Sequence, residues 1–467
     1  MVIHKCTAFI NKLKRIWPTN RVKILFIILI FLSSLYIIGH FRYIVMSKQG
    51  EIEEDPFTQA SNLMSKYTKL PNPNWQKWTT SNITNFYLYR AFLDNRTSVT
   101  NAPVIRVLLM KNNYKETALN YFCHIIFDDN VSITKPVSKL EQLSYMYRDF
   151  PGLQGFLLTC ELGVKYKDKH PKSVSISESI TENEQAQNRL KIEYNLKNPA
   201  TAKENFALCL KGLRFPDNDI SSYLVEWFEL LFLMGVNKIF VYVFEVHPNI
   251  YKVLRYYEGR NQIEIIPFSY PNHVYINKVQ GEKIHYTDCF YKNMNFYKYI
   301  AIFDYDEIII PKHDYTWLDM MNRLLTTLPN ETSYSDYRFR RYMSMKNMQV
   351  EIPKLPTTKD DVKLLYETRS TLDKGVKSIV DTETVSGLSN HFPTICTSDV
   401  CHPYDVDLSI GFAVHYRNTC LRGRDDLCSN KTIIRDIPIH RYSDRLMENV
   451  MRTLNSIPNY ELSLEKV

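Results

Sequence analysis

The glycine and cysteine patterns that commonly bind phosphate or zinc are missing from this chain. It has only 13 glycines in 467 residues, and no Walker loop or GxGxxG motif follows the first strand of its βα region, where Gly212 stands alone. Any phosphate group must therefore be held by something other than a glycine-rich loop. No CxxC pair occurs among the 9 cysteines, which disfavours a zinc site.

A concentrated basic surface is also missing. The net charge is +8, but the chain has no long run of Lys or Arg outside its N-terminus. Nucleic-acid-binding domains usually gather their basic residues on one face. We therefore expect no nucleic-acid partner.

The cysteines that are present favour disulfides. Of the 9, only Cys6 precedes the hydrophobic run described next, so an even number follows it, as is typical of an oxidising compartment. Two pairs are close in the sequence and can form local loops, whereas four other cysteines can pair over longer distances. The local pairs are Cys396 with Cys401 and Cys420 with Cys428, and the other four are Cys123, Cys160, Cys209 and Cys289.

An uncharged apolar run, Ile24 to Gly39, lies near the N-terminus, and its apolar character continues to Val45. Its length approaches the roughly 20 residues that span a bilayer. Basic residues precede it, so the positive-inside rule predicts a cytosolic tail over 1–23 and a transmembrane signal anchor over 24–45, with the rest of the chain across the membrane. A cleaved signal peptide is the alternative, but no clear small-x-small cleavage site follows.

A polar, acidic and proline-containing segment over 46–74 is predicted to be a stem that links the membrane to a folded domain. Asn-x-Ser/Thr sequons follow it and lie entirely beyond the apolar run, which supports a lumenal catalytic part. The sequons begin at Asn82, Asn95, Asn130, Asn330 and Asn430.

The remaining chain divides into two parts by its hydrophobic pattern. Short apolar runs separated by turns predict a small β-rich N-terminal subdomain over 75–200. From 201 to 460 strands alternate with helices, which predicts an α/β domain with a mostly parallel central sheet covered on both faces. The expected strands are 206–210, 238–244, 263–267 and 299–303, and the expected helices are 221–234, 248–258 and 281–295.

The most informative stretch is YKYIAIFDYDEIIIP, in which an apolar run ends abruptly in acidic residues. Tyr299 to Phe303 is typical of a strand buried on both faces. Asp304 and Asp306 follow at its carboxyl end, where ligands bind in open α/β sheets. Two carboxylates there suit Mg²⁺ or Mn²⁺ and the diphosphate that such an ion carries. We expect Glu307 to be a structural acid, because an apolar strand resumes directly after it; the alternative for the whole motif is an exposed, solvated turn.

Two blocks of the chain resemble glycosyltransferase family 92. The segment CLKGLRFPDNDISSYLVEWFELLFLMGVNKIFVYV is followed by YYE and then by IAIFDYDEIIIP. The resemblance covers about Phe206 to Tyr442. It implies a GT-A type nucleotide-sugar-binding fold, a single-pass type II Golgi membrane protein and the transfer of a sugar, usually galactose from UDP-galactose. The cofactor that it implies is Mn²⁺, with Mg²⁺ as the alternative.

The resemblance also implies a metal site. Asp304 and Asp306 match the DxD carboxylates of the family. Enzymes of the GT-A type commonly take a further ligand from a His near the end of the domain, and His415 in AVHYRNTC fits that place, with His391 and His402 as rivals.

Further site residues are expected around this metal. Lys211, Arg214 and Arg417 are the candidate contacts to the nucleotide sugar. The family leaves a β-linkage, so the reaction is expected to invert by direct displacement and to need a carboxylate base. Asp381 and Glu383 are the first candidates for the base, and Asp405 and Asp407 are the alternatives.

The sequence therefore predicts a lumenal, metal-dependent, inverting glycosyltransferase that transfers galactose to a glycan on a glycoprotein or glycolipid. The alternative is a non-catalytic lumenal protein that binds a glycan or a nucleotide sugar on the same fold. A phosphatase or nucleotidase is less favoured, because no cluster of His ligands accompanies the acids.

Overall fold

The computed structural model describes residues 74–96, 102–112, 121–143, 152–181, 188–195, 201–271, 276, 278–329, 333–345, 369–398, 400–417 and 438–460. The predicted tail, anchor and stem lie outside these residues, apart from residue 74. Within the described residues, no helix is both long and apolar enough to cross a membrane. The described chain therefore does not support the predicted localisation, a single-pass type II Golgi membrane protein, and we withdraw that prediction.

The N-terminal part is a nine-stranded, largely antiparallel sheet in the order β5-β4-β8-β9-β2-β3-β7-β6, with β1 paired to β2. This is the β-rich region that the alternating apolar runs predict. A disulfide between Cys123 and Cys160 joins β4 to β7. The strands are β1 (Gln76–Thr79), β2 (Asn85–Asp94), β3 (Val104–Lys111), β4 (Phe122–Phe127), β5 (Ser132–Pro136), β6 (Lys139–Gln142), β7 (Gln154–Glu161), β8 (Pro171–Ser177) and β9 (Leu190–Glu193), with a short 3-10 helix η2 (Val164–Tyr166).

A second sheet carries the βα region in the order β12-β11-β10-β13-β16-β15-β20-β14, with β19 paired to β15. Its first four strands are parallel, as predicted. The remaining strands form a mixed half. The strands are β10 (Glu204–Phe215), β11 (Lys238–Val246), β12 (Ile263–Pro267), β13 (Tyr297–Phe303), β14 (Glu307–Pro311), β15 (Asp336–Met345), β16 (Arg369–Asp381), β19 (Pro403–Val406) and β20 (Gly411–Arg417), and β17 (Val385–Leu388) with β18 (Pro393–Cys396) forms a separate pair.

The strand order reverses at β10, the point at which open α/β sheets have their ligand-binding crevice. The chain runs from β10 outward through β11 to β12, then crosses back to lay β13 on the other side of β10. In open α/β sheets, ligands bind outside the carboxyl ends of the strands where the order reverses. Here that point lies between β10 and β13, and the register pairs Leu210 with Phe303. Lys211 comes next on β10, and Asp304 directly follows the last residue of β13.

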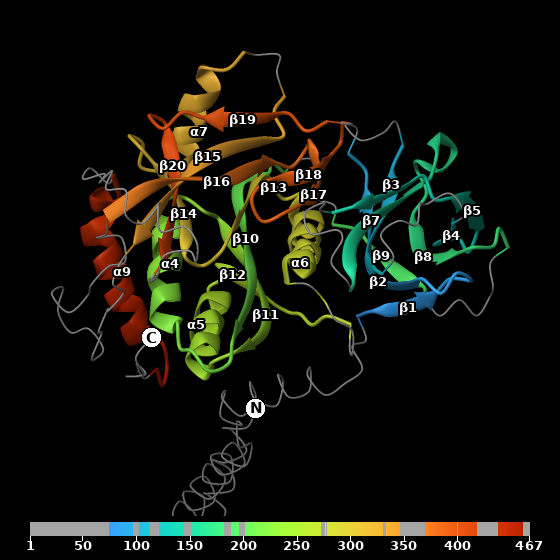
Figure 1. The fold of residues 1–467 in the computed structure, drawn as a ribbon, viewed down its shortest axis with the longest axis horizontal. Helices are drawn as coiled ribbons and strands as arrows, with labels where there is room; N and C mark the ends of the chain where they lie inside the picture. Colours follow the sequence, from blue (N-terminus) through green and yellow to red (C-terminus); the bar gives the residue numbers. More distant parts are fainter. Residues whose placement is uncertain are drawn as a thin grey trace, which may run out of the picture. The chain divides into compact units, whose positions relative to one another are not determined.

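Helices cover both faces of this sheet (Figure 1). One apolar cluster packs helices α4, α5, α7 and α9 on one face. Helix α6 lies on the other face, in a cluster shared with β2, β3 and β7 of the N-terminal sheet. The helices are α4 (Ser221–Leu233), α5 (Pro248–Gly259), α6 (Lys278–Asn293), α7 (Trp317–Thr326) and α9 (Ser443–Ser456), with the 3-10 helix η4 (Pro438–Tyr442) before α9.

Two further disulfides agree with the cysteine pattern. Cys209 on β10 is bonded to Cys289 on α6, and Cys396 to Cys401 in a local loop. The first of these fixes α6 against the strand that carries Lys211. The predicted pair of Cys420 with Cys428 lies outside the described residues. The sequons at Asn330 and Asn430 lie outside them too, whereas Asn82, Asn95 and Asn130 are exposed.

Candidate active site

The acidic residues lie in a tight turn between β13 and β14. The backbone N–H of Glu307 donates to the carbonyl of Asp304 (3.1 Å), which closes a four-residue β-turn. The Glu307 carboxylate accepts in return from the backbone N–H of Asp304 (3.2 Å). Trp227 on α4 donates its indole N–H to the carbonyl of Glu307 (2.7 Å). The turn is therefore fixed at both ends, and Asp304 and Asp306 are held at the carboxyl end of β13.

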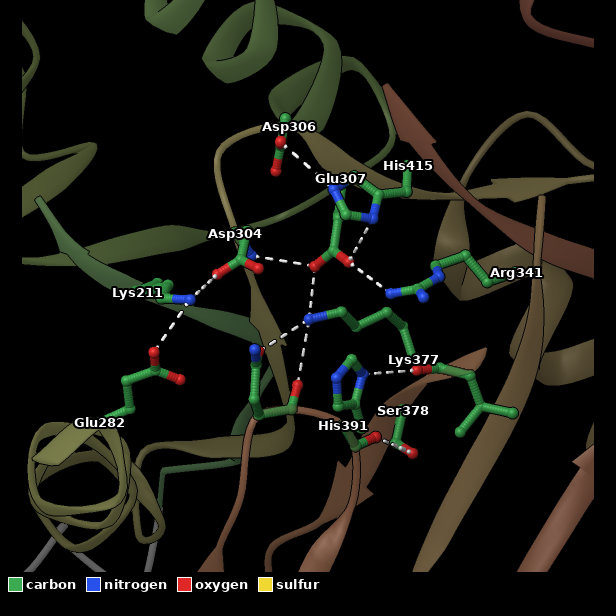
Figure 2. Close-up of polar contacts among 12 residues, drawn as sticks. Lys211, Glu282, Asp304, Asp306, Glu307, Arg341, Lys377, Ser378, His391 and His415 are labelled. Atoms are coloured by element: carbon green, nitrogen blue, oxygen red, sulfur yellow. Dashed lines mark hydrogen bonds and ion pairs between the residues drawn. The ribbon is translucent and has the colours of Figure 1, made fainter. Parts of the chain in front are cut away.

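Glu307 is the centre of a buried ionic network (Figure 2). Its carboxylate is fully buried and pairs with the fully buried ammonium of Lys377 on β16. Arg341 on β15 approaches the same carboxylate at 3.2 Å. Burial and the neighbouring Asp304 carboxylate raise the pKa of Glu307, but Lys377 and His415 outweigh them, so the pKa stays below its usual range. Glu307 therefore remains an anion that holds three strands together.

Asp304 faces the crevice beside β10. Lys211 lies between the carboxylates of Asp304 (3.3 Å) and Glu282 on α6 (3.0 Å). Burial raises the pKa of Asp304, but Lys377, Lys211 and His415 together lower it to about 2. The Oδ1 atom of Asp304 is buried and makes no hydrogen bond, although it lies at ion-pair distance from Lys211. This carboxylate is therefore charged, and it is held by an ion pair with Lys211.

Asp306 lies beside His415 on β20, because the register pairs Glu307 with His415. The Nε2 atom of His415 is 3.2 Å from the Oδ2 atom of Asp306, and its Nδ1 atom is 3.4 Å from the Oε1 atom of Glu307. The Nδ1 contact has ion-pair distance without hydrogen-bond alignment. If Nδ1 carries the proton and faces Glu307, the Nε2 lone pair faces Asp306, which is the orientation found in carboxylate–histidine–metal sites.

This geometry fits a divalent ion. Mg²⁺ binds oxygen ligands at about 2.1 Å, which places two adjacent ligands of an octahedral ion about 3.0 Å apart. The separation of 3.2 Å between Asp306 and His415 is close to that value. Among the described residues, no group of three or more His, Cys, Asp or Glu side chains is arranged to hold a metal by protein ligands alone. Such an ion would therefore depend on substrate phosphates and water for its other ligands, as Mg²⁺ usually does.

The other predicted contacts are scattered. Arg214 is exposed near the end of β10, and Arg417 ends β20 with a side chain outside the described part. The rival His391 donates from Nδ1 to the carbonyl of Val376 (3.0 Å), and burial together with Lys377 lowers its pKa to about 4. The rival His402 is exposed. Of the three histidines, His415 alone contacts Asp306 within the described residues.

Asp381 and Glu383 lie at the opposite end of β13 from the acidic turn. Asp381 pairs with Tyr299, five residues before Asp304. At a rise of about 3.3 Å per residue, this places Asp381 about 16 Å from Asp304 along the sheet. Glu383 pairs with Lys203 instead (2.5 Å). The rivals Asp405 and Asp407 are exposed, and Asp405 pairs in register with Arg338 on β15. The predicted role of Asp381 and Glu383 as base therefore gains no support from their position.

Two residues of the network, Lys377 and Arg341, were not expected from the sequence. Lys377 lies in the strand GVKSIVD, where the period of two places it on the same face as the buried Ile379. The sequence did contain one sign of this network: a lysine at a core-facing strand position needs a buried partner of opposite charge. Gly375 leaves space for the Arg341 side chain, because a Cβ at residue 375 would lie 2.6 Å from the guanidinium.

Comparison with known proteins identifies the family of this chain. The model of glycosyltransferase family 92 matches residues 204–460, more than half of the chain. The chain belongs to glycosyltransferase family 92. It is also similar to the beta-1,4-galactosyltransferase galt-1 of Caenorhabditis elegans, with 24% identity over 232 residues, which cover 48% of this chain and 51% of that protein. The chain thus spans about half the length of this relative.

Solved structures resemble the chain only weakly. A crystal structure of TarS from S. aureus has 8% identity and a TM-score of 0.22, and the match covers 38% of this chain and 47% of that one. The apo structure of the bifunctional glycosyltransferase WbbM has 10% identity and a TM-score of 0.19, and the match covers 32% of this chain and 27% of that one. Scores this low carry no weight, so the description of the fold rests on its own strand order.

Proposed function

We propose that the protein is a metal-dependent, inverting glycosyltransferase of the GT-A type that transfers galactose from UDP-galactose to a glycan acceptor on a glycoprotein or glycolipid. Membership of family 92 supports the reaction class. The galt-1 relative is named as a beta-1,4-galactosyltransferase, which supports galactose as the sugar and a β-linkage as the product. The acidic turn at the strand-order reversal supports a diphosphate donor.

The observation that carries the proposal is the pair formed by Asp306 and His415, backed by Glu307. In the proposed enzyme, Asp306 and His415 hold Mn²⁺ or Mg²⁺, and Asp304 lies in the same turn with its Oδ1 atom paired to Lys211. The ion would act as a Lewis acid that stabilises the negative charge on the departing diphosphate. Glu307 orients the imidazole of His415, and Lys377 with Arg341 keeps Glu307 in place.

Lys211 has a positioning role in this proposal. Its ammonium bridges Asp304 and Glu282 at the end of β10, so it fixes the carboxylate that borders the crevice. Burial lowers the pKa of Lys211, but Asp304 and Glu282 raise it further, so this lysine stays charged. We assign no base, because the predicted carboxylates lie at the other end of β13.

The test is a measurement of UDP release by the purified full-length chain from a panel of UDP-sugars. Each donor is supplied with Mn²⁺ or with a chelator, and with or without mixed glycan acceptors. We expect release from UDP-galactose that needs both metal and acceptor. Binding of a donor without turnover across the panel would contradict the proposal and favour the non-catalytic alternative.

A further inference from the structure

Helix α6 is buried along most of its length although it is rich in polar residues. It lies between the central sheet and the N-terminal sheet, so neither side of the helix faces solvent. Polar side chains in such a place need partners, because an unpaired buried polar group costs free energy. Seven of its polar residues are at most 5% exposed: Gln280, Glu282, Lys283, His285, Thr287, Asp288 and Asn293.

Most of these buried polar residues have a hydrogen-bond or ion-pair partner. Glu282 pairs with Lys211 (3.0 Å), His285 accepts the backbone N–H of Gly212 (3.1 Å), Thr287 accepts that of Leu388 (3.3 Å), and Asp288 accepts the hydroxyl of Tyr242 (2.6 Å). Gln280 also makes contacts. These bonds join α6 to β10 and β11 of the central sheet and to β17.

Lys283 is the exception. It is 1% exposed, and within the described residues it makes neither a hydrogen bond nor an ion pair. The charged groups that act on it are Glu282, Lys211 and Lys377, two of which are also cations. The Glu282 carboxylate is already engaged by Lys211. Removing an ammonium from water without a counter-charge costs several kcal/mol, and an anion bound beside Lys283 would offset that cost.

We infer that Lys283 binds the diphosphate group of the donor. The inference rests on the proposed function and adds a second, metal-independent anchor to it. Glu282, the chain neighbour of Lys283, pairs with Lys211, and Lys211 also contacts Asp304, so Lys283 lies on the part of α6 next to the acidic turn. Protein carboxylates pair with Lys211 and Lys377, which leaves the charge of Lys283 for the ligand. A compact ammonium is a common partner of phosphate oxygens.

The contact has a consequence for the reaction. The diphosphate gains negative charge as the glycosidic bond breaks, and a cation in a site without water interacts more strongly with the product than with the donor. Lys283 therefore stabilises the leaving group from the α6 side of the crevice, while a metal on Asp306 and His415 would act from the β20 side.

The probe is UDP alone, titrated calorimetrically into the full-length chain in the presence of a chelator and again with Mn²⁺. Lys283→Met is expected to weaken UDP binding about 10- to 100-fold in both conditions, as the loss of a charge-assisted bond predicts. The melting temperature of the ligand-free protein is expected to rise, because the variant removes an unpaired buried charge. Lys283→Gln is the second variant if the Met variant does not fold.

The matched control is Lys292→Met on the same helix. Lys292 pairs with Glu264 (3.0 Å) and lies about 13 Å further along α6, so UDP affinity should stay within twofold of the parent chain. Equal UDP affinity of the Lys283 variant and the parent would overturn the inference, and a lower melting temperature with unchanged affinity would identify a structural ion pair instead. A parent chain that binds no UDP would overturn the proposed function and this inference with it.

Discussion

Two similar acidic motifs lie at opposite ends of β13, and their surroundings differ. At the carboxyl end, Asp304 and Asp306 lie beside buried cations and a histidine, and the pKa of Asp304 is lowered to about 2. Near the amino end, burial raises the pKa of Asp381, and Glu383 pairs with a partly exposed lysine. The spacing of the acids is the same in both motifs. What differs is the partners: Lys211 contacts Asp304 and His415 contacts Asp306, whereas burial dominates the pKa of Asp381.

The fold itself explains the difference. The acidic turn follows a parallel strand at the strand-order reversal, where the next residue of β10 is Lys211. Asp381 is the last residue of an antiparallel strand, and its carboxylate accepts the backbone N–H of Glu383 in the turn that follows (2.8 Å). An acid pair becomes a candidate metal site because of its place in the sheet, and the predictions below test that difference.

The largest effect is expected for Asp306→Asn. The variant keeps the shape of the side chain but removes the charge that would hold a divalent ion, so transfer should fall at least about a thousandfold. UDP release and Mn²⁺ binding followed by electron paramagnetic resonance would both be measured.

Asp381→Asn is the matched control for that variant, because it makes the same chemical change at the other end of β13. Its transfer rate and Mn²⁺ affinity should stay within about threefold of the parent. If Asp306→Asn retained full activity, or if the parent were equally active with a chelator, the metal assignment would be wrong.

Glu307→Gln should mainly affect stability. It leaves the buried Lys377 and the neighbouring Arg341 without their anion, and breaking a buried ion pair in this way costs about 3–5 kcal/mol. Denaturant unfolding of the variant would give the difference in free energy. The control is Glu264→Gln, a more exposed partner of Lys292, for which a change of at most about 1 kcal/mol is expected.

Much of the first half of the catalytic fold was predictable from local patterns. The expected strand 299–303 lies within β13, and the expected helix 221–234 contains α4, because short apolar runs and helical periodicity are local signals. The partners of Glu307 were not predictable in the same way. Arg341 lies on β15 and Lys377 on β16. Both strands are distant from the turn in the sequence, and only strand pairing in the folded sheet brings them to it. Lys283 was hidden for another reason: its isolation depends on the N-terminal sheet that covers α6.

The pH dependence of stability should separate Lys283→Met from the parent chain. Burial, with the charges of Lys211 and Lys377, lowers the pKa of Lys283 to about 8 despite Glu282 beside it, while the unfolded chain keeps the ordinary value of 10.5. Between these values the unfolded chain binds more protons, so the stability of the parent rises with pH. The variant should be more stable by up to about 3 kcal/mol at pH 7, and the gap should shrink between pH 8 and pH 10.5.

Denaturant unfolding at a series of pH values measures that gap. The facing groups Glu282, Lys211, Lys377, Asp304 and His285 are present in both proteins, so their own titration largely cancels from the difference. A gap that stayed constant from pH 7 to pH 10.5 would show that the ammonium is not destabilised by burial.

The smallest effect is expected for Glu383→Gln, beside the amino end of β13. The Glu383 side chain is 53% exposed, and its partner Lys203 also donates to the carbonyl of Met294 (2.7 Å) and to the hydroxyl of Thr382 (3.0 Å). Lys203 therefore keeps two bonds when the carboxylate is lost, and an exposed ion pair contributes at most about 1 kcal/mol. Transfer should change less than twofold, and stability by less than about 1 kcal/mol. A loss of transfer like that of Asp306→Asn, with stability unchanged, would instead place the base at this end of the strand and remove the contrast between the two motifs.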